Sequence, residues 1–180
     1  MEKPYQAFRK LGINVDLIDE TRSLDGYRVV AAPMVYLLRE GWTEKVRNFV
    51  KNGGIFLLTY WSGIVDETDL CYLGGTPHDL MDVMGFRSME IDGLYDGEWN
   101  EGIPEPENPL HLELAYRCSH LCELVQPSTA EVVMTYGKDF YDGMPAMTRN
   151  VYGKGKAYAV CADFEQGPVS YTHLRAHETL

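Results

Sequence analysis

Residues 53–67 read GGIFLLTYWSGIVDE, and this stretch decides the fold of the chain. The apolar run at 55–58 has no polar residue to turn toward solvent, which is typical of a strand buried on both faces of a sheet. Open α/β sheets bind ligands beyond the carboxyl ends of such strands, so the Tyr-Trp-Ser of residues 60–62 and the acidic loop after it form a candidate site. That edge has no nucleophilic cysteine and no phosphate-binding glycine pattern.

Length and composition limit the possible functions. The chain has 180 residues and 45% hydrophobic residues, which fits one globular domain with a real core. Its net charge of -11 disfavours nucleic acid and anionic membranes as partners, because both bind clustered Lys and Arg. No apolar run approaches membrane-spanning length, and the amino terminus does not read as a signal peptide. We therefore predict a cytoplasmic protein that needs no cofactor.

Helical and strand patterns alternate along the chain. They predict a three-layer α/β domain with a mostly parallel sheet flanked by helices, and with antiparallel strands at the C-terminal end. Residues 92–109, rich in Gly, Pro, Asp and Glu, read as a loop. Sheets of this kind normally begin with a central strand, whereas this chain begins with a helix. We therefore expect the first strand to be missing, which would leave a slot in the sheet. The predicted helices are 3–11, 43–52 and one opening at Pro77; the predicted strands are 13–18, 27–32, 55–59, 86–91, 130–136, 144–151 and 156–161.

Two spacings resemble half of a metal site. Cys118 and Cys122 are four residues apart with His120 between them, but a tetrahedral site needs a second close pair, which the sequence lacks. His173 and His177 could share a helix face, yet the Glu of a His-Glu-x-x-His motif is absent. We predict reduced thiols and no metal site.

Several spaced blocks, in order, closely resemble the trimerisation domain of family 42 β-galactosidases, with the likeness running from about Tyr5 to Val160. Position 61 departs from the family's pattern, in which a basic residue precedes Ser62-Gly63, so a contact made by that basic residue is not expected here. The blocks are 30–38 (VAAPMVYLL), 49–54 (FVKNGG), 58–69 (LTYWSGIVDETD), 73–77 (LGGTP), 140–150 (FYDGMPAMTRN) and 152–158 (YGKGKAY).

The resemblance implies a flavodoxin-like or class I glutamine amidotransferase-like fold that packs three subunits together, lying between a catalytic TIM barrel and a small β-sandwich. In that family the two catalytic glutamates belong to the barrel, so no catalytic residue carries over and galactoside would meet only the absent barrel. We expect residues 1–168 to form this domain, incomplete at its start. Residues 169–180 fit nothing in the family and read as a translated sequencing adapter, a non-native tail.

The candidate edge offers three kinds of chemistry to weigh. Asp66, Glu67 and Asp69 could supply the paired carboxylates of a glycosidase, but together they read as one solvated loop whose pKa values should stay ordinary. Ser62 could act as a nucleophile with His78 or His111, but the Gly-x-Ser-x-Gly elbow is not met. An amidotransferase needs a thiolate at the strand's end, and the nearest cysteine, Cys71, lies well down the loop.

The aromatic residues of this edge have two interpretations. Tyr36, Trp42, Tyr60 and Trp61 either pack in the core or form an interface, where aromatic residues are enriched. The family resemblance favours an interface for Tyr60 and Trp61, with Asp66 and Glu67 beside them. The leading hypothesis is a non-catalytic subunit-assembly domain, homotrimeric in a parent β-galactosidase. The alternative is a free-standing amidotransferase-like hydrolase or small-molecule-binding domain.

Overall fold

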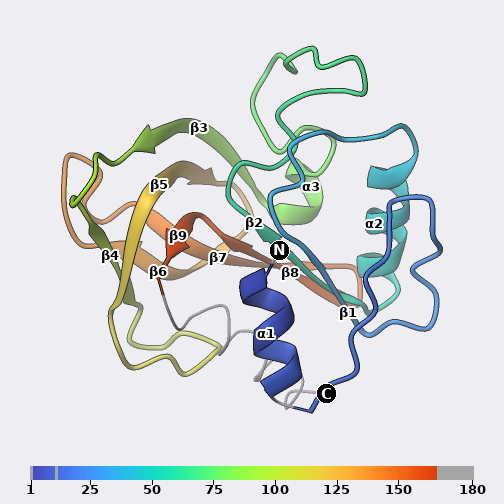
Figure 1. The fold of residues 1–180 in the computed structure, drawn as a ribbon, viewed down its shortest axis with the longest axis horizontal. Coiled ribbons are helices and arrows are strands. Elements are labelled where there is room, and N and C mark those ends of the chain that lie inside the picture. The colour runs from blue at the N-terminus through green and yellow to red at the C-terminus, as the bar shows by residue number, and fades with distance from the viewer. Residues whose placement is uncertain (1, 11, 166–180) are drawn as a thin grey trace.

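The computed structural model describes residues 2–10 and 12–165 (Figure 1), which leave Leu11, the last residue of the predicted helix 3–11, and the predicted tail outside. In this part of the chain three helices accompany one sheet of nine strands. The elements are α1 (Glu2–Lys10), β1 (Val29–Ala32), α2 (Trp42–Lys51), β2 (Ile55–Thr59), α3 (Met81–Met84), β3 (Phe86–Gly93), β4 (Asn100–Pro104), β5 (Tyr116–Pro127), β6 (Glu131–Tyr136), β7 (Pro145–Tyr152), β8 (Gly155–Val160) and β9 (Ala162–Phe164).

β2 is buried on both faces, as its apolar run predicts. Successive side chains of a strand point to opposite faces, and here Ile55 and Leu57 join one core cluster while Phe56 and Leu58 join the other. Leu57 and Leu58 are each only 2% exposed. The strand pairs in parallel with β1 on one side and β8 on the other. β2 therefore holds the two cores together.

The prediction of a mostly parallel sheet is wrong. The strand order is β1-β2-β8-β7-β6-β4-β5-β3, with β9 added against β5, and only the β1–β2 and β2–β8 pairs are parallel. The physical reason is the length of the connections: short turns join β6, β7 and β8, and such turns permit only antiparallel pairing. The sheet is thus mixed, with a small parallel part and a larger antiparallel part.

The antiparallel part curls on itself. β9 begins two residues after β8 ends, yet it pairs with β5 at the far end of the strand order. β5 also contacts β7 across the curl. Figure 1 shows the strands at this end of the sheet curving around one another, and the core cluster that they enclose contains no described residue of α1, α2 or α3. That core is built from large side chains, among them the fully buried Tyr136, Tyr141 and Met147.

Helices cover the other face of the parallel strands. α2 buries Trp42, Val46 and Val50 against this face, and α3 adds Val83 and Met84. Trp42 is therefore a core residue rather than an interface residue. α2 begins one residue earlier than expected, at Trp42, after Gly41 in the left-handed region.

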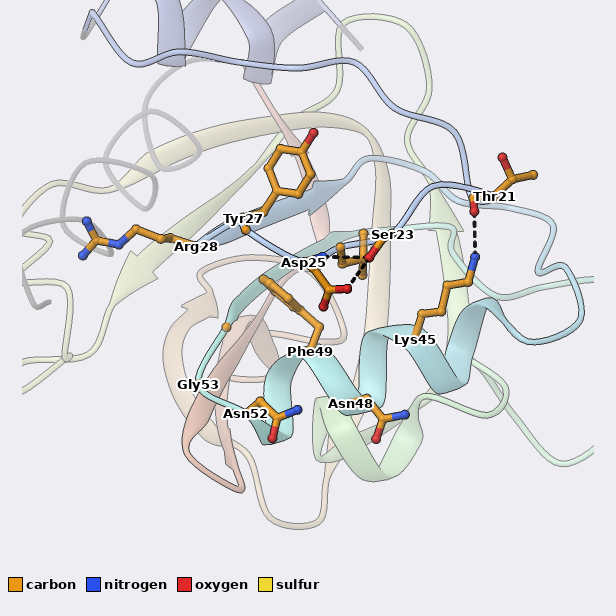
Figure 2. Close-up of a pocket in the computed structure, with 13 residues that line it drawn as sticks. Thr21, Ser23, Asp25, Tyr27, Arg28, Lys45, Asn48, Phe49, Asn52 and Gly53 are labelled. Carbon is orange, nitrogen blue, oxygen red and sulfur yellow. Dashed lines mark hydrogen bonds between the residues drawn. The ribbon is translucent and has the colours of Figure 1, made fainter.

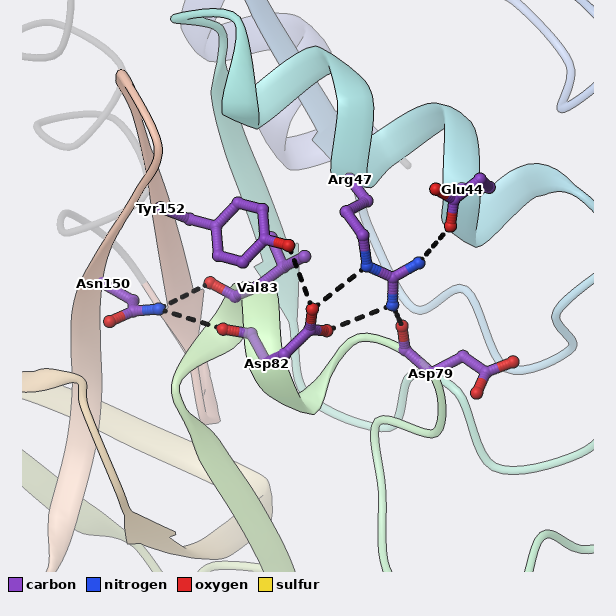
Figure 3. Close-up of polar contacts among 7 residues, drawn as sticks. All are labelled: Glu44, Arg47, Asp79, Asp82, Val83, Asn150 and Tyr152. Carbon is purple, nitrogen blue, oxygen red and sulfur yellow. Dashed lines mark hydrogen bonds and ion pairs between the residues drawn. The ribbon is translucent and has the colours of Figure 1, made fainter.

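A polar network fastens α2 to α3 and β7 (Figure 3). Arg47 of α2 donates from Nε and Nη2 to the carboxylate of Asp82, at 3.0 and 3.1 Å, and its guanidinium also contacts Glu44. Asn150 of β7 donates to the carbonyl of Val83 at 2.9 Å. Burial favours the neutral form of Asp82, but its bonds and charge interaction with Arg47 outweigh that effect and hold its pKa below the ordinary value. The network compensates for the shortness of α3, which has only four residues.

Three other expectations need correction. Residues 13–18 form no strand, and the loop predicted over 92–109 contains β4. The longest strand, β5, was not predicted at all. Within the described residues, no helix is long and apolar enough to cross a membrane.

The β7–β8 turn must approach α2 closely, and this gives a test of the packing. A Cβ on Gly155 would lie 2.2 Å from the Val50 carbonyl oxygen and 2.3 Å from that of Gly54. Both neighbours are backbone atoms and cannot move aside cheaply. We expect Gly155→Ala to lower the free energy of unfolding by roughly 2–3 kcal/mol in urea melts. Gly93→Ala, where a Cβ meets no atom within 4 Å, is the matched control and should change it by under about 0.5 kcal/mol. Equal losses in the two variants would contradict this account.

Candidate functional site at the carboxyl end of β2

The turn after β2 is not a nucleophile elbow, because among the described residues no helix follows it before α3 at Met81. Trp61 takes the left-handed conformation, with φ of 56°, and Gly63 follows with φ of 66°. Ser62 is 2% exposed; its hydroxyl donates to the Thr59 carbonyl at 2.8 Å and accepts from the Val35 amide at 3.1 Å. Because both functions of the hydroxyl are used, Ser62 ties two loops together and is not a nucleophile.

A buried carboxyl group lies directly behind this turn. Glu123 of β5 is 4% exposed, and its Oε2 accepts the Trp61 amide hydrogen at 3.2 Å. Burial raises the pKa of Glu123 to about 7, although hydrogen bonds from Ser88 and Trp61 favour the charged form. An acyl-transfer enzyme with Ser62 as its nucleophile would need the Gly63 amide to stabilise an oxyanion. That amide already donates to the Val35 carbonyl at 2.8 Å.

Tyr60 joins β2 to β9 through its phenol. Its amide donates to the Val160 carbonyl at 2.7 Å, and its ring is half-buried. Burial, followed by the charge and hydrogen bond of Asp163, raises the pKa of Tyr60 to about 12. Asp163 also contacts His120 Nδ1 at 3.2 Å. Tyr60 therefore anchors the start of the turn to β8 through its amide and to β9 through its phenol.

The predicted partners of a nucleophile are used elsewhere. The His78 ring stacks on Tyr72, with centroids 3.9 Å apart, and its Nε2 lies 3.4 Å from Asp79. His111 is exposed in the loop between β4 and β5. Cys71 is exposed in the acidic loop. Cys161 is completely buried, which raises the pKa of its thiol well above the ordinary value. These residues do not assemble a nucleophile with a base.

The acidic loop is shaped by one of its own carboxylates. Asp66 Oδ1 accepts from the Thr68 amide and hydroxyl, at 2.8 and 2.7 Å, and from the Leu70 amide at 3.1 Å. The Thr68 hydroxyl, followed by the two amides, lowers the pKa of Asp66. The expectation of an ordinary pKa is therefore wrong for Asp66, which is a still poorer proton donor. Glu67 and Asp69 are exposed on the same loop.

Cys118 and Cys122 do not form a metal site with His120. Cys118 and Cys122 are free and buried in the curled core, with sulfur atoms 4.0 Å apart. The hydrogen bond to Cys122 and burial raise the pKa of the Cys118 thiol. The His120 side chain is 75% exposed and contacts Asp163 instead. Among the described residues no three His, Cys, Asp or Glu side chains group as metal ligands do; His173 and His177 lie outside that range.

A cavity of about 630 Å³ lies at the opposite ends of the same strands (Figure 2). Some of its polar side chains are engaged in local bonds: Lys45 donates to the carbonyls of Glu20 and Thr21, and Ser23 bonds to Asp25. Figure 2 shows Lys45 reaching the Thr21 segment from α2. We therefore interpret the cavity as a packing gap between residues 20–28 and α2 rather than as a ligand site.

Sequence reasoning missed two residues of this site, Glu123 and Asp163. A weak signal existed for the first: Glu123 stands alone among apolar neighbours in residues 121–125 (LCELV), which is unusual for a solvent-facing position. Asp163 has no comparable signal, because its meeting with Tyr60 depends on the pairing of β9.

The geometry defines a mixed α/β domain in which the turn after the central strand is filled by the domain's own side chains. The chain belongs to the family described as the β-galactosidase trimerisation domain, whose family model matches residues 1–175. The β-galactosidase BglY of Alicyclobacillus acidocaldarius is 48% identical over 161 residues, which cover 89% of this chain and 23% of that protein. The β-galactosidase Pbg of Clostridium perfringens is 45% identical over 159 residues, or 88% of this chain and 23% of Pbg.

Solved structures show the same likeness. The crystal structure of the cold-adapted β-galactosidase from Rahnella sp. R3 matches with a TM-score of 0.94 and 45% identity, over 98% of this chain and 26% of that chain. The β-galactosidase from Bacillus circulans sp. alkalophilus also has a TM-score of 0.94, at 38% identity and with the same coverage of each chain. The chain thus spans about a quarter of the length of these relatives.

The buried Glu123 makes stability depend on pH in a defined direction. Its pKa is about 7 in the folded chain and 4.5 in an ordinary environment, so the folded state holds the proton more tightly. The associated stability is complete below pH 4.5 and is lost as the pH rises to 7, by up to roughly 3 kcal/mol. Urea melts at pH 5 and pH 8 should show this loss in the native chain. Glu123→Gln should have a smaller loss, whereas Glu113→Gln, at an exposed site, should keep the native one. Parallel behaviour of the native chain and Glu123→Gln would refute the assignment.

Proposed function

We propose that this chain is the subunit-assembly domain of a β-galactosidase and that it performs no catalysis itself. The observation that carries the proposal is the match of the β-galactosidase trimerisation-domain model to residues 1–175. The relatives are roughly four times as long as the matched region, which leaves room for a catalytic part elsewhere in the polypeptide. Turnover of galactosides would then belong to that part, in the cytoplasm of the cell.

An exposed aromatic pair supports a self-association surface beside the β2 turn. Trp61 is 38% exposed and packs edge-to-face on Tyr36, which is 40% exposed, with ring centroids 6.3 Å apart. The amides of Gly63 and Ile64 bond to the carbonyls of Val35 and Tyr36, so the two loops move as one. Exposed aromatic anchors on a fixed backbone are typical of interface hot spots.

The predicted interface residues take different roles in this proposal. Trp61 is the anchor, and Glu67, exposed nearby in sequence, belongs to a polar rim. Tyr60 and Asp66 act indirectly, since their polar groups are engaged with Asp163 and with the Thr68 segment. A closed threefold ring needs a heterologous interface, so this surface would meet a different patch on the next subunit.

We also propose that the parallel part of the sheet has the layering of flavodoxin-like and amidotransferase-like folds. The support is that β1, β2 and β8 are parallel and that α2 covers one of their faces, as one helical layer of such folds does. The amidotransferase-like alternative function finds no such support, because no cysteine lies at the end of β2 and the amide after Ser62, that of Gly63, is already bonded to the Val35 carbonyl.

Self-association should depend on Trp61. Analytical ultracentrifugation of the purified chain over a range of concentrations should show association that Trp61→Ala weakens at least tenfold, as for a buried interface tryptophan. Tyr95→Ala is the control, because Tyr95 is 81% exposed in the loop between β3 and β4. The assembly surface is misplaced if both variants associate like the native chain.

The purified chain should hydrolyse no β-galactoside. Glycoside cleavage needs an acid and a nucleophile on either side of the sugar, whereas Asp66 and Glu67 lie side by side in one loop and the pKa of Asp66 is lowered. An aryl β-galactoside should therefore stay intact beyond the buffer rate. Turnover that disappears in the double variant Asp66→Asn, Glu67→Gln would move catalysis into this loop and overturn the proposal.

A further inference from the structure

Strand β5 brings two thiols together although the sequence places them four residues apart. Along a regular strand, residues four apart are separated by about 13 Å. Here Cys118 is opposite Phe164 of β9, and the register then shifts. Because of that shift, Cys122 is opposite Ala162, only two residues before Phe164. The two cysteines therefore stand as near neighbours along β9, and the residues between them bulge out of the ladder.

The bulge leaves the two sulfur atoms in contact. They lie 4.0 Å apart, and both thiols are buried in the curled core. Cα atoms two positions apart on a strand are separated by about 6.6–6.8 Å. That separation is at the upper end of the roughly 4.4–6.8 Å that a disulfide spans. A bond between the two sulfur atoms therefore needs side-chain rotation and a small backbone movement, and the pairing with β9 can stay.

The backbone of the bulge can supply that movement. His120 has φ of 64°, and its side chain is 75% exposed. The tip of the bulge is tied to the chain after β3 by the Leu94 amide, which donates to the His120 carbonyl at 2.9 Å. Segments that leave a regular ladder open more easily than the core around them. Opening at this bond would also admit a small solute to the two thiols.

The two thiols differ in acidity, which gives the pair a nucleophile. The hydrogen bond from the Cys118 thiol holds the pKa of Cys122 below its ordinary value, although burial acts in the opposite direction. The same hydrogen bond, together with burial, raises the pKa of Cys118. The thiolate is the form of cysteine that attacks peroxides. Cys122 is therefore the attacking residue of the pair and Cys118 the residue that resolves the product.

We propose that Cys118 and Cys122 form a peroxide-sensitive dithiol that closes to an intrachain disulfide and fixes the bulge of β5. The Cys122 sulfur attacks one oxygen of a hydroperoxide, and the O–O bond breaks. Cys122 becomes a sulfenic acid, while the other oxygen leaves as water or an alcohol with the Cys122 proton. The Cys118 sulfur then attacks the Cys122 sulfur, and the hydroxyl group leaves as water with the Cys118 proton. The two thiols lose two electrons and two protons, which the peroxide gains.

The other two cysteines do not compete for this bond. Cys161 belongs to the core cluster on the opposite face of the sheet from the dithiol. Cys71 is exposed in the acidic loop. Trypsin should place the dithiol, Cys161 and Cys71 in three separate peptides, which are 118–138, 157–175 and 52–87. The oxidation state of each thiol can therefore be followed by itself.

The test treats the full chain carrying Cys71→Ser, which prevents bonds between chains, with hydrogen peroxide in native buffer. The chain is then unfolded in iodoacetamide and digested. Peptide 118–138 should lack two hydrogens and carry no alkyl group, and dithiothreitol should restore two thiols that alkylate. Two alkyl groups on this peptide after peroxide, or a sulfinic acid in place of the disulfide, would overturn the proposal.

Two matched variants separate the roles of the thiols. With Cys118→Ser, whose hydroxyl can still donate to the remaining sulfur, Cys122 should gain oxygen under the same treatment. With Cys122→Ser, Cys118 should stay reduced, because its thiol keeps its proton. The reverse pattern would refute the assignment of the attacking residue.

The disulfide should also hold the bulge closed. Hydrogen exchange at the Leu94 amide, which is bonded to the His120 carbonyl, should slow by roughly fivefold or more in the oxidised chain and recover after dithiothreitol. Cys122→Ser, treated in the same way, should show no change. Unchanged exchange at Leu94 in a chain that peptide mapping shows to be cross-linked would refute the fixing of the bulge.

Discussion

The complete desolvation of β2 is the constraint on which the rest of this structure depends. A strand without water on either face must find partners for all of its amides and carbonyls, because an unpaired buried backbone group costs free energy comparable to a lost hydrogen bond. β1 and β8 supply those partners. The two faces of β2 then nucleate two separate cores, one under α2 and α3 and one inside the curled strands.

The curled, antiparallel part of the sheet also buries polar groups, but it satisfies them through side chains. It buries tyrosines beside its aliphatic residues. Two of the phenols have polar partners: Tyr136 donates to the Cys161 carbonyl at 2.7 Å and Tyr141 to Asp92 at 2.9 Å. Gly102 of β4 lets the Phe164 ring approach, since a Cβ there would lie 2.7 Å from it. Helices are thereby unnecessary on this face, because the sheet covers itself.

Sequence patterns were informative where periodicity is regular and failed where it breaks. β2 and α2 were predictable because continuous apolar runs and 3.6-residue spacing survive intact in the sequence. β5 was not, because its pairing shifts near His120, which has φ of 64°, and its alternation breaks there: none of residues 119–121 is buried, whereas residues 122–125 are all buried. A bulge of this kind hides a strand from any test of alternation. β4 is masked by its own Gly102 and Pro104, which resemble a loop.

At the candidate site, too, the local sequence predicts the position of the turn but not the distant residues that contact it. The turn at residues 60–63 follows from β2, so its place could be predicted, but its chemistry depends on Glu123, 62 residues away in β5. A nucleophile at Ser62 would need the Gly63 amide to stabilise a developing oxyanion, and that amide already bonds to the Val35 carbonyl. The Trp61 amide bonds to Glu123, a carboxyl group whose pKa is raised by burial. The hydrogen-bonding groups of the turn are therefore used to hold the fold together, while the Trp61 ring stays 38% exposed, which is why we propose it as the anchor of the assembly surface.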